Sequence, residues 1–192
     1  NVAATLGRLG VPVALVSRLG RDEAAATVLA GAAEFGVDLS LSSRSDARPT
    51  ARYIAVLEPT GEMMVAVADM AIYDEMTPAV VTPALQALAD RAVWLVDTNL
   101  PRETIAAILA AKPAGTIGAV EAVSTPKAEK LRGLLDRIDL LFVNADEAAT
   151  LSGRAVRGEA DAEAAARALA DRGVGSVVVN LGPAGAGLLS DG

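Results

Sequence analysis

An apolar run near the middle of the second half of the chain ends in an asparagine and continues into an acidic helical start. Residues 140–143 are large and apolar without alternation, which is typical of a parallel strand buried on both faces. Asn144 follows at the expected carboxyl end of this strand, and Glu147 lies three residues later in the first turn of the expected helix. Backbone N–H groups there favour anions, and a carboxylate beside bound phosphate can hold Mg²⁺ directly or through water. A purely structural alternative explains the same residues equally well: Asn144 ends the strand, and acidic residues favour the start of a helix.

Strands and helices alternate along most of the chain. Helices are expected at about 23–35, 77–90, 102–111, 126–136 and 161–171. Apolar strands are expected at 12–17, 92–96, 116–120, 140–143 and 176–179. Repeated alternation of this kind produces parallel sheets with helices on both faces. We therefore predict an α/β fold with a doubly wound, mainly parallel sheet.

Residues 37–69 interrupt this alternation. Two short apolar runs, 51–57 and 63–68, flank a loop with Pro59 and Gly61, and no helix separates them. This pattern predicts a small antiparallel sheet inserted in the α/β body. The predicted domains are an α/β core formed by residues 1–36 and 70–192 and a β lid formed by residues 37–69.

The predicted strands share one further property, because each delivers a polar residue to its carboxyl end. These residues are Ser17, Asp97, Glu121, Asn144 and Asn180. In open α/β sheets, ligands bind outside the carboxyl ends of the strands, so we expect these side chains to line one cleft. The alternative is that polar residues are present only because strands must end.

Composition excludes several kinds of chemistry. The chain has no cysteine and no histidine, which removes thiol nucleophiles, imidazole bases and the usual zinc ligands. Its net charge of −7 disfavours a nucleic-acid polymer or a membrane as partner, and we expect a small-molecule substrate and a cytoplasmic location. The chain begins with Asn1 rather than Met, and we interpret it as part of a longer protein.

Three segments resemble the ribokinase-like (PfkB) carbohydrate kinases. Asn1, Ala3, Gly10 and Gly20 have the spacing of the latter part of a signature of this family. Asn144 and Glu147 match its N-x-x-E motif, and residues 181–185 resemble its T-L-G-x-x-G nucleotide segment. Each match has a structural explanation by itself, but together, in order and across nearly the whole chain, they indicate this family.

The resemblance implies phosphoryl transfer from ATP, with Mg²⁺, to a sugar or nucleoside hydroxyl. The residues that it implies for substrate binding are Asn1, Asp69 and Asn99. Those implied for the nucleotide are Asn144, Asn180, Gly182 and Gly185, with Glu147 for the metal. The family's catalytic Asp is expected beyond Gly192, so we expect residues 1–192 alone to be inactive. In this family the lid covers the substrate and often builds a homodimer.

Within the family, the middle of the chain is similar to the pseudouridine kinases. Residues 61–70, 97–100 and 123–127 carry this similarity. It implies pseudouridine as the acceptor, phosphorylated at its 5′ hydroxyl. Asp69 or Asn99 would accept a hydrogen bond from the ring N–H that pseudouridine has in addition to those of uridine. Two departures affect the ribose-side strand end and the phosphate contacts: Glu121-Ala122 replaces the expected Asp-Pro, and Asn180 stands where Thr is usual.

Three alternatives are compatible with parts of the sequence or must be set against it. Another sugar kinase of the same fold, acting on ribose, fructose or 2-keto-3-deoxygluconate, fits the shared motifs. A non-catalytic ligand sensor on this fold is also open, because the expected base lies outside the sequence. A dinucleotide-binding oxidoreductase would need a Gly-rich turn after its first strand, and residues 17–22 do not have one.

Overall fold

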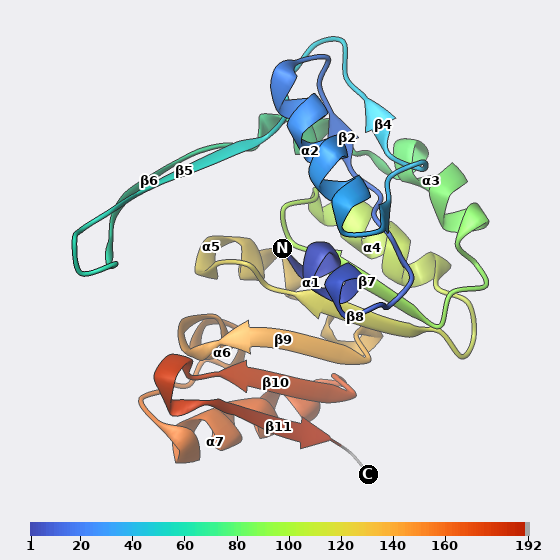
Figure 1. Ribbon diagram of the computed structural model, residues 1–192. Helices are drawn as coiled ribbons and strands as arrows, with labels where there is room; N and C mark the ends of the chain where they lie inside the picture. Colours follow the sequence, from blue (N-terminus) through green and yellow to red (C-terminus); the bar gives the residue numbers. More distant parts are fainter. Residues whose placement is uncertain (191–192) are drawn as a thin grey trace. The chain divides into compact units, whose positions relative to one another are not determined.

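The computed structural model of the protein describes residues 1–190 (Figure 1). The chain forms two compact units, Asn1–Gln86 and Ala87–Gly192, and each is described by itself. Among the described residues, no helix is both long enough and apolar enough to cross a membrane.

The first unit contains short helices and two-residue strands. Its elements up to residue 44 are α1 (Val2–Arg8), β1 (Val13–Ala14), β2 (Arg18–Leu19), α2 (Glu23–Glu34), β3 (Val37–Asp38) and β4 (Ser43–Arg44). β1 pairs with β3 and β2 with β4, both in parallel. The strand expected over 12–17 is reduced to β1, because beyond Leu15 the chain bonds partly to a side chain: the Ser17 N–H donates to Ser42 Oγ at 3.0 Å.

The hairpin expected between residues 51 and 68 is confirmed. β5 (Arg52–Leu57) and β6 (Met63–Asp69) pair antiparallel and form a two-stranded ribbon that extends away from α2, β2 and β4 (Figure 1). All β5 side chains are exposed, among them Tyr53 at 56% and Ile54 at 61%. The unit continues with a 3₁₀ helix, η1 (Ala71–Glu75), and with α3 (Pro78–Ala87). The extent of the lid as a domain stays a prediction.

The second unit is built on a five-stranded sheet with the order β11-β10-β9-β8-β7. Its strands are β7 (Val93–Asp97), β8 (Ile117–Glu121), β9 (Leu140–Asn144), β10 (Ser176–Asn180) and β11 (Ala186–Ser190). The first four are parallel, and β11, which the sequence did not predict, joins β10 antiparallel. With the β5–β6 ribbon, this sheet confirms the predicted fold class.

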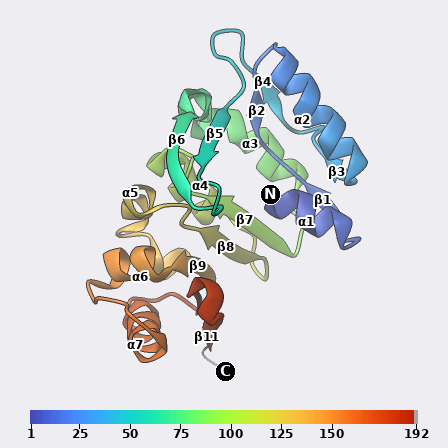
Figure 2. The ribbon, with the colours of Figure 1, turned by 60° about the vertical axis from the view of Figure 1, so that its left-hand side comes forward.

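Helices connect these strands. They are α4 (Arg102–Ala111), α5 (Thr125–Ala128), α6 (Ala145–Ser152) and α7 (Glu159–Ala170), with 3₁₀ helices η2 (Glu129–Leu131), η3 (Leu135–Arg137) and η4 (Gly182–Ala184). α6 and α7 pack side by side (Figure 2). The continuous helix expected over 126–136 is wrong, because Arg132, with a ψ of 127°, leaves the helical conformation and Gly133 has a φ of +74°.

Alternate residues of the central strands form the core of the second unit. Leu141 and Val143 of β9 are buried, as are Val177 and Val179 of β10. Leu140 and Phe142, on the other face of β9, are only half-buried. The expected burial of β9 on both faces is therefore only partly met within the described residues.

Candidate functional site

The carboxyl ends of four parallel strands bring predicted site residues to one edge of the second unit's sheet. In the strand register, Asp97 of β7 pairs with Glu121 of β8, and Asn144 of β9 pairs with Asn180 of β10. Each pair is adjacent because parallel strands in register end side by side. The fifth residue of the predicted set, Ser17, belongs to the first unit. Four of the five predicted strand ends therefore share one edge of this sheet.

Asn144 and Glu147 form a reciprocal capping box at the start of α6. The Glu147 N–H donates to Asn144 Oδ1 at 2.9 Å, while the Glu147 carboxylate accepts from the Asn144 backbone N–H at 2.8 Å and from Asn144 Nδ2 at 2.9 Å. Glu147 is 2% exposed. This arrangement satisfies free N–H groups of the helix start and fixes the Asn144 amide at the strand end.

A cavity of about 340 Å³ opens beside this capping box. Its walls are Asn144, Ala145, Asp146, Val156, Arg157, Gly158, Asn180, Leu181, Gly182 and Ala184. Three of the four residues predicted for the nucleotide thus line one cavity, whose size is in the usual range for a small-molecule site. The cavity belongs entirely to the second unit.

The turn after β10 shapes the other wall of this cavity. The Gly182 N–H donates to Asn180 Oδ1 at 2.8 Å, and the Gly185 N–H donates to the Gly182 carbonyl at 3.0 Å. Gly182 and Gly185 have φ values of +62° and +97°, which favour glycine at both positions. Gly185, the fourth predicted nucleotide residue, closes this turn and is not part of the cavity wall.

Sequence reasoning missed Arg157 in the wall of the cavity. Arg157 lies in the loop between α6 and α7, and its backbone N–H donates to Asp161 Oδ2 at 3.0 Å. Arg157 is exposed, and both Arg157 and Asp146 are part of the cavity wall. No motif singles this residue out; the only signal was a loop before a helix start.

Asn99, predicted for the substrate, lies in the loop after β7. Its backbone N–H donates to Asp97 Oδ1 at 2.8 Å, and its side-chain oxygen accepts from Lys127 Nζ at 2.5 Å. Because an ammonium group only donates, this contact requires the amide oxygen to face Lys127. The amide NH₂ makes no hydrogen bond within residues 1–190 and remains a donor.

Glu121, one of the two departures from the family pattern, is half-buried at the end of β8. Burial raises the pKa of its carboxyl, and the negative charges of Glu147 and Asp97 raise it further. The Val123 N–H, which donates to Glu121 Oε1 at 3.4 Å, acts in the opposite direction. The carboxylates at this sheet edge therefore repel one another. Even so, the described residues contain no group of three or more acidic side chains arranged to hold a metal ion.

The remaining predicted substrate residues belong to the first unit. Asn1 is the exposed N-cap residue of α1 and makes no side-chain capping bond. Asp69 is the exposed last residue of β6, where it pairs in register with Arg52, and its Oδ1 accepts from the Ala71 N–H at 3.4 Å. Asp69 is therefore held at the root of the β5–β6 ribbon.

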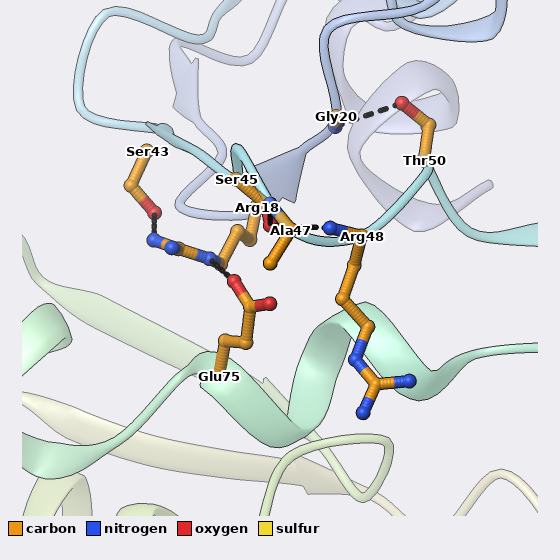
Figure 3. A network of polar contacts seen from close by, with 8 residues as sticks. All are labelled: Arg18, Gly20, Ser43, Ser45, Ala47, Arg48, Thr50 and Glu75. Atoms are coloured by element: carbon orange, nitrogen blue, oxygen red, sulfur yellow. Dashed lines mark hydrogen bonds and ion pairs between the residues drawn. The ribbon is translucent and has the colours of Figure 1, made fainter.

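The segment around β2 is bonded to the chain on both sides of this ribbon (Figure 3). Arg18 Nε donates to Glu75 Oε2 at 2.6 Å, just after the ribbon, and Arg18 also donates to Ser43 Oγ at 3.1 Å. On the other side, the Gly20 N–H donates to Thr50 Oγ1 at 2.9 Å. The Asp22 carboxylate accepts from the Thr50 hydroxyl, the Thr50 N–H and the Ala25 N–H, which lower the pKa of Asp22 to about 2.

Two glycines of the signature have structural explanations. A Cβ on Gly20 would lie 2.7 Å from Thr50 N and 2.8 Å from Arg48 O, so the backbone approach leaves no room for a side chain. Gly10 has open space around it, but its φ of +77° favours glycine. The signature spacing therefore has a structural basis in the first unit.

Comparisons with known proteins identify the family of the chain. The model of the pfkB family of carbohydrate kinases matches residues 1–192. The chain is 31% identical over 182 residues to the pseudouridine kinase of Escherichia coli K12, covering 95% of this chain and 58% of that protein. It is 28% identical over 181 residues to an uncharacterized sugar kinase of the same strain, covering 94% of this chain and 50% of that protein. The chain thus spans about half the length of these relatives.

Solved structures give the same result. A carbohydrate kinase from Agrobacterium tumefaciens superimposes with a TM-score of 0.78 at 31% identity, covering 92% of this chain and 56% of that one. An Arabidopsis thaliana ribokinase solved with ribose and ATP shares the fold, with a TM-score of 0.80 at 22% identity, covering 98% of this chain and 61% of that one. The motifs, the sheet and the family match over every residue lead to one conclusion: the chain belongs to the pfkB family of carbohydrate kinases.

Proposed function

We propose that the whole protein transfers the γ-phosphoryl group of ATP to a hydroxyl of a small sugar or nucleoside, and that its acceptor is the 5′ hydroxyl of pseudouridine. In this reaction the acceptor oxygen forms a bond to the γ-phosphorus, the bridging oxygen leaves with ADP, and a base takes the hydroxyl proton. The resemblance assigns that base to an Asp beyond Gly192, which stays a prediction.

One observation carries the nucleotide half of this proposal: Asn144, Asn180 and Gly182 line one cavity at the carboxyl ends of β9 and β10. Such an edge is where α/β folds bind nucleotides. The Asn144 amide, locked by Glu147, offers a hydrogen bond of fixed direction. Arg157 supplies positive charge that suits phosphate oxygens.

The acceptor half rests on Asn99 and Asp69. Because Lys127 bonds to the Asn99 oxygen, Asn99 presents its NH₂ and suits a carbonyl or hydroxyl oxygen of the acceptor. Asp69 is then the better candidate to accept the extra ring N–H of pseudouridine. An acceptor left unpaired by uridine would cost about 1–3 kcal/mol, or roughly ten- to hundred-fold in selectivity.

Mg²⁺ belongs to the proposal through the resemblance, with Glu147 as its predicted residue. The donors described do not fit a directly bound ion: Glu147 is 2% exposed, and both of its carboxylate oxygens already accept hydrogen bonds from Asn144. Direct coordination would require the capping box to open. Contact through water remains compatible with this geometry, and no step of the proposal depends on it.

Acceptor kinetics with the whole protein test the proposal. With saturating ATP, we expect the highest kcat/KM for pseudouridine among pseudouridine, uridine, ribose and fructose. A higher value for any of the other three would overturn the proposed acceptor while leaving the kinase proposal intact. Absence of ATP-dependent product with all four would count against the kinase itself and would favour a ligand sensor.

A homodimer through the lid remains part of the proposal. The β5–β6 ribbon exposes several large apolar side chains, including Ile54, Met64 and Val67, each more than 60% exposed. An isolated two-stranded ribbon is marginally stable, and exposed sheet edges are usually paired or protected. Light scattering during gel filtration of the whole protein should give twice the monomer mass; a monomer at high concentration would contradict the dimer.

A further inference from the structure

Lys130 bridges the two peptide carbonyls that flank Asn99. Its Nζ donates to Thr98 O at 2.8 Å and to Leu100 O at 2.9 Å. Lys130 comes from η2, about thirty residues later in the sequence, and is half-buried. Charge-assisted bonds to two carbonyls fix the path of the main chain on both sides of Asn99.

Other hydrogen bonds also hold the loop that contains Asn99, and they show which part of its support comes from Lys130. Thr98 is fully buried; its hydroxyl donates to the Ala122 carbonyl, and its N–H donates to the Glu121 carbonyl at 3.2 Å. These contacts tie the loop to the end of β8. Lys130 adds a link to η2, so the backbone around Asn99 is bonded to both β8 and η2.

The route from β8 to η2 is itself constrained. Val123 has a φ of +65°, and the Ser124 N–H donates to the Ala122 carbonyl at 2.7 Å, so Val123 is the centre of a classic γ-turn. A β-branched residue rarely adopts this conformation, which persists only where the surroundings enforce it. The turn leads directly into α5 and η2, which carry Lys127 and Lys130 three residues apart.

We propose that Lys130 is a positioning residue for the phosphoryl acceptor, acting through Asn99. Lys127 orients the Asn99 amide, and Lys130 fixes the peptide groups from which that amide extends. Together they keep the Asn99 NH₂ in one place and direction at the carboxyl edge of the sheet. This inference rests on the proposed function, because the contact between Asn99 and the acceptor belongs to it.

The test compares Lys130→Met, Lys130→Arg and Lys112→Met in the whole protein. Lys112 is the control, since its ammonium also donates to a backbone carbonyl, Thr116 O at 2.6 Å, and pairs with Asp139 Oδ2 at 2.8 Å, away from the Asn99 loop. We expect Lys130→Met to raise the acceptor KM about tenfold, with kcat and the ATP KM changed less than about threefold. Lys130→Arg should recover most of this loss. Equal acceptor KM values in Lys130→Met and Lys112→Met would overturn the proposal.

A double variant tests whether the effect passes through Asn99. If it does, Asn99→Ala with Lys130→Met should have an acceptor KM within about twofold of that of Asn99→Ala alone, because effects on one contact do not add. A further tenfold rise in the double variant would show that Lys130 acts by another route and would overturn the proposal.

Hydrogen exchange separates this inference from the proposed function. In Lys130→Met, the amides of Thr98 and Asn99 should exchange at least about tenfold faster than in the unchanged protein, while Lys112→Met leaves them unchanged. Unchanged exchange in Lys130→Met would overturn the positioning role even in an active kinase. Faster exchange in a protein that phosphorylates no acceptor would support the positioning of Asn99 and refute the proposed function alone.

Discussion

Replacing Glu147 with Gln separates the structural and functional interpretations of the N-x-x-E motif. The carboxylate accepts two hydrogen bonds from Asn144, at 2.8 and 2.9 Å, in a site where Glu147 is 2% exposed. Gln keeps one accepting oxygen and places an NH₂ group where the second was. One donor of Asn144 then loses its acceptor and faces another donor.

The size of the effect follows from this loss. A hydrogen bond to a charged group contributes about 1.5–3 kcal/mol, so its loss dominates the change. Removing the Glu147 charge also relieves its repulsion of Glu121, which offsets part of the loss. We therefore expect the free energy of unfolding to fall by about 1–2 kcal/mol.

Urea unfolding of the whole protein at neutral pH measures this change. Glu163→Gln is the matched control, because Glu163 forms an exposed ion pair with Arg167 one turn away on α7 and should cost less than about 0.5 kcal/mol. Equal midpoints for the two variants would refute the capping argument. In kinase assays, Glu147→Gln should also lower Mg²⁺-dependent turnover about tenfold with little change in acceptor binding. An unchanged Mg²⁺ dependence would contradict the predicted metal role.

Three other substitutions test separate parts of the structure. Gly20→Ala should destabilise the protein by about 1–3 kcal/mol in thermal denaturation, because the added Cβ would meet the backbone of residues 48–50. Gly31→Ala on α2 is the control: it has open space around it and should leave the stability unchanged or raise it slightly. Glu121→Gln should raise the free energy of unfolding at pH 7, because the raised pKa means that the folded state disfavours the ionised carboxyl. This gain in stability should vanish as the pH falls below 4.5, the usual pKa of a Glu carboxyl, and a gain that persists at low pH would contradict this cause. Arg157→Ala should weaken ATP binding about tenfold in calorimetric titrations, with Arg154→Ala, outside the cavity wall, as its control; equal affinities would remove Arg157 from the nucleotide site.

The parts of the fold that were predictable have strong local signals. β9 and β10 are short apolar runs ended by Asn144 and Asn180, and the β5–β6 hairpin has a Pro- and Gly-containing loop between two apolar runs. In each case the apolar pattern and the residues that end it indicate the same element. Sequence reasoning therefore placed these strands within one or two residues.

The parts that were not predictable depend on contacts distant in sequence. The strand over 12–17 is shortened where Ser17 bonds to the side chain of Ser42. A window of neighbouring residues contains no trace of this contact. The break in the helix expected over 126–136 is different, because Gly133, with a φ of +74°, is a local signal that the helical pattern of its neighbours outweighed.

The candidate site divides in the same way. Asn144, Asn180 and Gly182 belong to recognisable motifs, and they do share one cavity. Arg157 and Lys130 belong to none, because they reach the site from a loop and a 3₁₀ helix whose positions depend on packing. Motifs therefore identified the strand ends and missed the residues that other elements bring to them.

Isotope transfer tests whether the protein moves a phosphoryl group from ATP to a nucleoside hydroxyl. The whole protein would be incubated with ATP labelled at the γ-phosphate, Mg²⁺ and pseudouridine, and the products separated by chromatography. The proposal predicts that the label appears in pseudouridine 5′-phosphate, with one ADP formed for each product molecule. Label recovered only as inorganic phosphate, or ATP left unconsumed with every acceptor, would contradict it.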